Sequence, residues 1–188
     1  KEGFKTCSND EIYDDFYVNI YDTLLLSEKK NKFEVGQVLE VLDLEDESDI
    51  LDLGSGTGHQ VELFNKEGHK CLGVDKSNSM VKKAKENFPQ NDYSKGDITN
   101  SNLCKPSSYD VVTCFYFTIY YVKDKKAFLE NCLTWLRPGG YLVIHLVDRS
   151  KFDPIIPPTN PLLIVDAQKY AKKRITNSIV HFKNFKYD

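Results

Sequence analysis

The feature that most restricts the fold of this chain is a short apolar run followed by a glycine-rich turn. The run occupies residues 50–53, contains Asp52, and is followed by Gly54, Gly56 and Gly58 at every second position. Such a run suits a buried parallel strand, which is apolar on both faces. Glycines let the backbone turn sharply and approach a ligand, and the helical pattern that follows begins with free N–H groups. The stretch predicts the ligand-binding end of a strand–helix–strand unit.

The spacing of the glycines excludes two common phosphate-binding turns. A dinucleotide-binding turn of the form G-x-G-x-x-G requires glycine at position 59, where this chain has His59. A P-loop requires Gly-Lys followed by Ser or Thr, and the sequence contains no such run. A nicotinamide-dependent dehydrogenase and a P-loop nucleotidase are therefore disfavoured.

Length and composition describe an ordinary globular protein. A chain of 188 residues with 40% hydrophobic and 28% charged residues predicts one domain with a sizeable core. The net charge of -3 argues against a surface built mainly for nucleic acid. We expect a cytoplasmic protein without a membrane segment, because no apolar stretch approaches membrane-spanning length and the cysteines include no C-x-x-C pair. The five cysteines, for which neither disulfides nor a metal site are predicted, are Cys7, Cys71, Cys104, Cys114 and Cys132.

Helical periodicity precedes the glycine turn. A first helix is predicted from a cap at Asn9 or Asp10 to about Leu26, and a second over 32–44. The first helix carries an apolar stripe that is expected to face the core, and an adjoining stripe of tyrosines. The apolar stripe is Ile12, Phe16, Ile20 and Leu24, and the tyrosines are Tyr13, Tyr17 and Tyr21.

After the turn, strands and helices alternate, which is typical of a parallel α/β sheet. The predicted strands are 49–53, 71–74, 92–95, 109–115 and 141–147, and the predicted helices are 58–66, 77–87 and 123–136. Proline-rich residues 154–161, a basic helix over 166–174 and a last strand over 176–187 are expected to follow.

The ends of the second and fourth strands carry the signals for a ligand site. Asp75 ends the second strand, 21 positions after Gly54. In a doubly wound sheet this carboxylate lies beside the first crossover, where it can accept both hydroxyls of a ribose; the alternative is a helix-capping acid. The fourth strand ends in Cys114 and Phe115, at the edge where the reactive centre of an open α/β sheet lies.

Five segments together resemble the motifs of class I S-adenosylmethionine-dependent methyltransferases, most closely the small-molecule type. These segments are Asp52 to Gly58, Asp75, Gly96-Asp97, the strand 109–115, and the turn 136–140. The resemblance implies a Rossmann-like, doubly wound α/β sheet that is mostly parallel. It also implies strand order 3-2-1-4-5 with a C-terminal antiparallel strand, and N-terminal helices over the cofactor site.

The same resemblance implies a set of site residues. S-adenosylmethionine is the implied cofactor, and S-adenosylhomocysteine is its product. No metal is expected. No catalytic base is assigned, because His145 is interpreted as a histidine of the fifth strand. The cofactor-binding residues are expected to be Tyr13, Tyr21, Asp52, Gly54, Ser55, Gly56, Gly58, His59, Asp75, Lys76, Met80, Asp97, Ile98, Cys114 and Phe115. Tyr116, Phe117 and Tyr120 are expected to face the substrate.

The implied domain has three parts: a helical cap over 1–48, a cofactor-binding core over 49–148, and a substrate-side loop, helix and edge strand over 149–188. The family normally finishes its sheet with two antiparallel strands, and this chain reaches Asp188 after one. We therefore expect either a longer natural chain or a second chain over that edge, as in a dimer.

The predicted reaction moves the methyl group of S-adenosylmethionine to a nucleophile on a small molecule, with catalysis mainly by positioning. Aromatic residues after the fourth strand favour a small, planar or amine-bearing acceptor. Two alternatives stay open: a protein or RNA methyltransferase, and a non-catalytic S-adenosylmethionine-binding subunit that regulates a partner.

Overall fold

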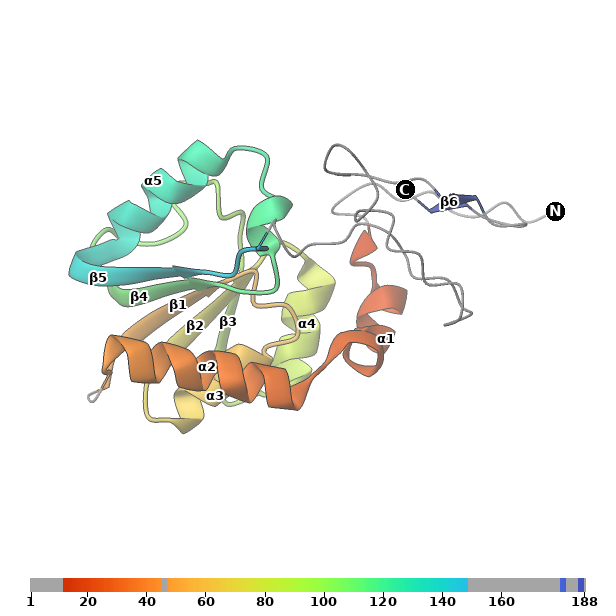
Figure 1. Cartoon of the computed structure of the whole chain (residues 1–188), viewed down its shortest axis with the longest axis horizontal. Coiled ribbons are helices and arrows are strands. Elements are labelled where there is room, and N and C mark those ends of the chain that lie inside the picture. Colours follow the sequence, from red (N-terminus) through yellow and green to blue (C-terminus); the bar gives the residue numbers. More distant parts are fainter. Residues whose placement is uncertain (1–11, 45–46, 149–179, 182–185, 188) are drawn as a thin grey trace, which may run out of the picture. The chain divides into compact units, whose positions relative to one another are not determined.

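A five-stranded parallel sheet forms the centre of the first of two compact units, Lys1–Leu146 and Val147–Asp188, in the computed structural model (Figure 1). The structure describes residues 12–44, 47–148, 180–181 and 186–187. The strand order is β3-β2-β1-β4-β5, so the predicted order 3-2-1-4-5 is confirmed. The strands are β1 (Asp49–Leu53), β2 (Lys70–Asp75), β3 (Asp92–Lys95), β4 (Tyr109–Cys114) and β5 (Leu136–Ile144).

Helices cover both faces of the sheet. Figure 1 shows α5 on one face and α2 and α3 on the other. The helices are α1 (Asp15–Leu25), α2 (Glu28–Leu42), α3 (His59–Lys66), α4 (Asn78–Asn87) and α5 (Lys125–Trp135), with a short 3-10 turn at Thr118–Tyr120. Side-chain oxygens of Ser27, Ser77 and Asp124 accept backbone N–H groups at the starts of α2, α4 and α5, which fixes where these helices begin.

Each face of the sheet has its own hydrophobic core. Alternate residues of β1 point to opposite faces, so that Ile50 packs with α2, α3 and α4 while Leu51 packs with α5. Phe64 lies in the first core and Trp135 in the second, both fully buried. The apolar run of β1 is therefore covered on both sides, as a parallel strand requires.

The predicted apolar stripe of the first helix is wrong. Phe16 is 74% exposed and Leu24 60%, and Val18 is the buried residue of α1. The helix begins after Asp14, whose carboxylate accepts the Tyr17 N–H, and not after Asn9 or Asp10. Tyr17 and Tyr21 of this helix pack with Tyr13, which precedes it, and the three rings meet edge to face. The periodicity of the sequence identifies the two stripes, but it does not predict which of them packs against the rest of the protein.

Only one face of α5 packs against the sheet. Leu129 and Leu133 are exposed, whereas Phe128, Cys132 and Trp135 are buried against the sheet. The buried side chains of α5 belong to the second core, together with side chains of β1 and β4.

In the second unit, the described residues form a small antiparallel pair, β6 (Val180–His181) with β7 (Lys186–Tyr187). The single strand predicted over 176–187 is therefore wrong, since two strands of this range pair with each other. The predicted loop over 154–161 and helix over 166–174 lie outside the described residues. The unit boundary lies at 146–147, close to the predicted end of the core.

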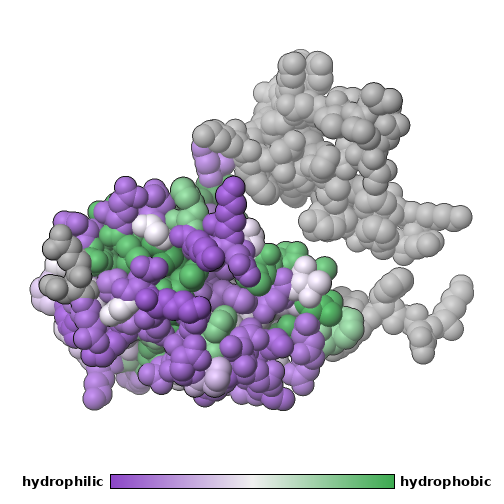
Figure 2. Space-filling view, turned by 90° about the horizontal axis from the view of Figure 1, so that it is seen from below, coloured by the Kyte–Doolittle hydropathy of each residue, from purple (hydrophilic) through white to green (hydrophobic). Residues whose placement is uncertain are grey.

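The face seen from below in Figure 1, which carries α2 and α3, is mostly hydrophilic and is broken by hydrophobic areas (Figure 2). Phe33 and Val41 of α2 contribute exposed apolar side chains. Among the helices that the structure describes, none is long and apolar enough to cross a membrane.

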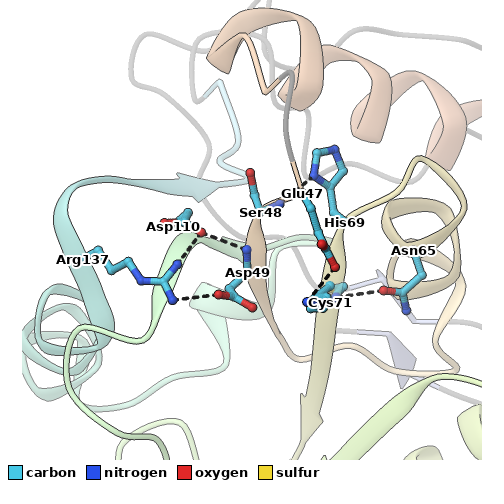
Figure 3. A network of polar contacts seen from close by, with 9 residues as sticks. Glu47, Ser48, Asp49, Asn65, His69, Cys71, Asp110 and Arg137 are labelled. Atoms are coloured by element: carbon cyan, nitrogen blue, oxygen red, sulfur yellow. Dashed lines mark hydrogen bonds and ion pairs between the residues drawn. The ribbon is translucent and has the colours of Figure 1, made fainter.

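At the amino ends of the strands, Arg137 joins β1, β4 and β5 (Figure 3). Its guanidinium lies 2.6 Å from Asp110 and 2.7 Å from Asp49, and the Asp110 carboxylate also accepts the Asp49 N–H at 2.9 Å. These bonds fix the register of three strand ends at once. Nearby, the Ser48 N–H donates to the His69 ring.

Asp52 is a buried carboxylate in the middle of the sheet. It is 2% exposed, and the Thr113 hydroxyl of β4 donates to it at 2.7 Å. Burial raises the pKa of Asp52 to about 7, although the Thr113 hydrogen bond acts in the opposite direction.

Replacing Arg137 tests the network at the amino edge. Arg137→Gln keeps polarity and removes the charge, so we expect a lower urea midpoint because two carboxylates lose their partner. The loss should shrink in about 1 M salt, where the screening length is about 3 Å. An unchanged midpoint at low salt would show that this network does not stabilise the sheet; Lys126→Gln, on exposed α5 surface, is the matched control.

Asp52→Asn tests the buried carboxyl. Its pKa is higher in the folded chain, at about 7, than the ordinary 3.8. Its contribution to stability is therefore complete below that ordinary value and is lost as pH rises toward 7. Relative to the unsubstituted chain, the variant should gain about 2–4 kcal/mol of unfolding free energy between about pH 4 and about pH 8.

Urea titrations at both pH values measure this change. Asp97→Asn is the control with the opposite sign, because hydrogen bonds from Thr99 hold the pKa of Asp97 below its usual value. A difference between Asp52→Asn and the parent chain that does not vary with pH would contradict the assignment.

Candidate functional site

A cavity of about 380 Å³ opens at the carboxyl ends of the strands. It lies where the strand order reverses between β1 and β4, the place at which open α/β sheets bind ligands. Its lining consists of Tyr13, Tyr21, Gly54, Gly56, Asp75, Lys76, Ser77, Met80, Asp97, Ile98, Thr99, Tyr116, Thr118, Tyr121, Val122, Lys123 and Asp124.

The turn after β1 forms the floor of this cavity. The N–H groups of Gly54 and Ser55 both donate to the Val74 carbonyl of β2. Gly54 and Gly56 have positive φ angles of 76° and 53°, which glycine adopts without strain. A Cβ at Gly54 would collide with the Thr118 side chain, whereas a Cβ at Gly56 would meet no atom within 4 Å. Gly56 therefore faces open space on the cavity side of the turn.

Asp75 ends β2 and holds the turn in place. One carboxylate oxygen accepts the Gly56 N–H at 2.9 Å, and the other accepts the Ser77 N–H at 2.8 Å. Burial raises the pKa of Asp75, against the lowering effect of the N–H groups of Ser77, Gly56 and Lys76. Ser77 in turn caps α4 and donates its hydroxyl to the Tyr13 carbonyl.

A second carboxylate, Asp97, lies at the end of β3 with apolar side chains close by. Its Oδ1 accepts from both the N–H and the hydroxyl of Thr99, and Lys76 lies 3.4 Å from its Oδ2. Met80, which is buried, and Ile98 supply the apolar part of the wall. This wall thus offers an acceptor edge beside an apolar surface.

Asp22 fastens α1 to the glycine turn and to α4. Its Oδ1 accepts the Thr57 hydroxyl at 2.6 Å, and its Oδ2 lies 3.1 Å from His59 Nε2 and 3.2 Å from Asn87 Nδ2. Burial acts to raise the pKa of Asp22, but the bonds from His59 and Thr57 outweigh it and hold the pKa low. No motif in the sequence marks Asp22 as a residue of the site.

The segment after β4 closes the cavity from another side. Tyr116 and Phe117 have positive φ angles, which are uncommon for residues other than glycine. Tyr116 donates its hydroxyl to Asn31 at 3.1 Å, and the Lys30 ammonium lies 3.4 Å from the centroid of its ring. Phe117 packs on the His145 ring, with centroids 4.1 Å apart.

The expected cofactor residues divide into three groups. Nine line the main cavity: Tyr13, Tyr21, Gly54, Gly56, Asp75, Lys76, Met80, Asp97 and Ile98. Asp52, Ser55, His59 and Phe115 line a smaller adjoining hollow of about 40 Å³, which shares Tyr21, Gly54, Gly56 and Tyr116 with the main cavity. Gly58 and Cys114 line neither space.

The structure places Gly58 and Cys114 inside the fold. A Cβ at Gly58 would collide with the Tyr93 hydroxyl, and Cys114 is fully buried in the core under α5. Of the expected substrate residues, Tyr116 lines both spaces, while Phe117 and Tyr120 line neither.

Several cavity residues were missed by the sequence analysis. They are Ser77, Thr99, Thr118, Tyr121, Val122, Lys123 and Asp124. Most belong to the connection between β4 and α5, whose location at the carboxyl edge of the sheet was itself a signal. The rule applies to the connection as well as to the end of the strand, since both lie at the same edge of the sheet.

Known proteins are similar to this chain in sequence and in fold. A family model described as a methyltransferase domain matches residues 51–144, half of the chain. The chain is 30% identical over 140 residues to a dTDP-4-amino-2,3,4,6-tetradeoxy-D-glucose N,N-dimethyltransferase of Saccharopolyspora spinosa, which covers 71% of this chain and 55% of the relative. It is 28% identical over 140 residues to a ubiquinone biosynthesis O-methyltransferase of Xanthomonas campestris, covering 72% and 55%.

Among solved structures, the chain is similar to a methyltransferase of Thermotoga maritima described as a possible histamine N-methyltransferase. The TM-score is 0.57 at 27% identity, covering 72% of this chain and 60% of that one. The chain spans about half the length of the curated relatives it matches. The matched model, the relatives and the parallel sheet agree, and the chain belongs to the class I S-adenosylmethionine-dependent methyltransferase family.

Proposed function

We propose that this chain binds S-adenosylmethionine in the cavity at the carboxyl edge of the sheet and transfers its methyl group to a small-molecule acceptor. The observation that carries the proposal is the pairing of an open Gly56 with the Asp75 carboxylate at the ends of adjacent strands. This pairing sets a polar acceptor beside a backbone that a ligand can approach closely.

The residues of the cavity fit the parts of such a cofactor. Asp75 provides an acceptor suited to ribose hydroxyls, and Asp97 with Met80 and Ile98 provides an acceptor beside an apolar wall suited to adenine. The small hollow beside Asp52, Ser55 and His59 offers polar partners for the amino-acid end. We propose that Gly58 and Cys114 act through the backbone only, since their own positions lie inside the fold.

The cofactor supplies an activated methyl group when bound, so the protein needs to orient the acceptor and exclude water. Positioning of this kind can lower a barrier by about 7–11 kcal/mol in favourable cases. Tyr116 and Tyr121, together with Tyr13 and Tyr21, would form the water-excluding wall. Asp75, Asp97 and Asp124 each hold backbone or side-chain donors already, which supports a positioning role for the cavity.

The names of the relatives support a small-molecule acceptor, one being an N,N-dimethyltransferase and one an O-methyltransferase. A protein or RNA acceptor and a non-catalytic regulatory role remain as alternatives, and methyl transfer to a small molecule distinguishes both from the proposal. We also propose a reducing, cytoplasmic setting, which the free thiols of Cys71, Cys104, Cys114 and Cys132 support. We further propose that the protein forms a dimer, which a sedimentation experiment would test.

Calorimetric titration tests cofactor binding. S-adenosylmethionine and S-adenosylhomocysteine should bind, and NAD should not. Gly56→Val should abolish binding, because its side chain would enter the cavity. Gly68→Val is the matched control, since Gly68 also has positive φ and open space around it but lies after α3, outside the cavity lining. Full binding by folded Gly56→Val would overturn the proposal.

Asp75→Ala tests the ribose assignment. One charged hydrogen-bond acceptor contributes about 1.5–3 kcal/mol, so the affinity for S-adenosylhomocysteine should fall about ten- to a hundredfold. Asp75→Asn keeps one oxygen acceptor and should lose less affinity. Equal affinity of the folded Asp75→Ala variant and the parent chain would remove Asp75 from the binding site.

A further inference from the structure

Tyrosines make up an unusual share of the cavity wall. Tyr13 and Tyr21 come from the α1 segment, and Tyr116 and Tyr121 from the connection after β4. The rings of Tyr13 and Tyr21 meet edge to face at 6.4 Å, and a hydrogen bond joins Tyr13 to Tyr121. Two segments that are distant in the sequence therefore present phenol rings to one space.

The phenols of Tyr13, Tyr21 and Tyr116 stay neutral over the physiological pH range. Burial raises the pKa of Tyr13 and Tyr116, and raises that of Tyr21 to about 12. A neutral phenol presents the negative face of its ring, which attracts cations. The protein already uses this attraction, since Lys30 lies over the Tyr116 ring while its charge is balanced by Glu34 at 3.3 Å.

The charged residues of the cavity favour a cation as well. Three carboxylates line it, against the two ammonium groups of Lys76 and Lys123, and Lys76 is paired with Asp97. The carboxylates already accept bonds from within the protein: Asp75 from Gly56, Asp97 from Thr99, and Asp124 from the Ala127 N–H. These bonds hold the carboxylates in place, and each carboxylate contributes negative potential to the cavity.

The charge balance of methyl transfer distinguishes between acceptors. A basic amine reacts in its neutral form, after its ammonium proton has passed to solvent water. Its lone pair then forms the N–C bond, the C–S bonding pair stays on sulfur, and the positive charge passes from sulfur to nitrogen. A fixed lining that stabilises cations then serves the reactants and the product alike. When an oxyanion attacks, the two charges cancel, and the same lining stabilises the reactants more than the transition state.

We propose that the methyl acceptor is a basic amine and that the tyrosines of this cavity stabilise the positive charge on its nitrogen. This inference rests on the proposed function and adds the chemical class of the substrate. The product complex is then S-adenosylhomocysteine together with an alkylated ammonium ion.

The probe for this complex is choline, compared with its neutral isostere, the alcohol in which a tert-butyl group replaces trimethylammonium. Both are titrated into protein saturated with S-adenosylhomocysteine. Because that ligand fills the donor's place, a cation that binds beside it must lie in the acceptor's place. Choline should bind at least about tenfold more tightly than the isostere, which has the same shape without the charge.

Substitutions at Tyr121 locate the effect. Tyr121→Leu should reduce the preference for choline severalfold, and Tyr121→Phe should retain it because the ring is kept. Tyr141→Leu is the matched control, an exposed tyrosine of β5 outside the cavity lining. Thermal unfolding of each variant shows that it folds.

Equal binding of the two probes, or binding of neither in the presence of bound S-adenosylhomocysteine, would overturn the amine assignment and leave the proposed function intact. A preference for choline that survives Tyr121→Leu and is lost in Tyr141→Leu would also overturn it. Failure of S-adenosylhomocysteine itself to bind would instead contradict the proposed function, and the inference with it.

Discussion

The bond from the Gly56 N–H to the Asp75 carboxylate is the contact on which the cavity depends. It joins the turn after β1 to the end of β2, while the N–H groups of Gly54 and Ser55 bond to the carbonyl of Val74 in β2. A turn held at three points to its neighbouring strand keeps its shape when no ligand is bound. The start of α4 depends on the same carboxylate, through Ser77.

The amino and carboxyl edges of the sheet have different roles. At the amino edge, Arg137 bonds Asp49 and Asp110 and aligns three strands. At the carboxyl edge, Tyr116 and Phe117 follow β4 with positive φ angles, which are uncommon for residues other than glycine, and Tyr116 lines the cavity. Unusual backbone is tolerated there because the cores on both faces of the sheet hold the strands independently.

Much of the fold could be predicted from the sequence because its signals are local. The bounds of β1 and β3 agree with their predictions, and the strand order followed from the resemblance. The inward face of α1 could not be predicted. The apolar stripe that begins at Ile12 and the tyrosine stripe that begins at Tyr13 have the same spacing, and only their contacts in the folded chain distinguish them. Asp22 was missed for a related reason: its partner Thr57 lies 35 positions away, and no motif connects them.

The same reasoning applies to the site. Glycines and acids at strand ends carry a recognisable spacing, so that nine of the expected cofactor residues line the main cavity. Side chains of a connecting segment have no such spacing: Tyr116 lines the cavity while its neighbour Phe117 turns to His145. The difference arises because Tyr116 and Phe117 both adopt the left-handed backbone conformation. The conformational preferences of tyrosine and phenylalanine do not predict this conformation.

The attachment of α1 has a consequence for access to the cavity. Val18 is the buried residue of this helix. The α1 segment also makes polar contacts, through Asp22 with the glycine turn and through hydrogen bonds from the serines at the start of α4. Neither hydrophobic core contains a residue of α1, so the sheet keeps both cores when the helix detaches. The helix can therefore open as a unit at a small part of the global unfolding free energy. Its amides should exchange with solvent well before those of the strands beneath.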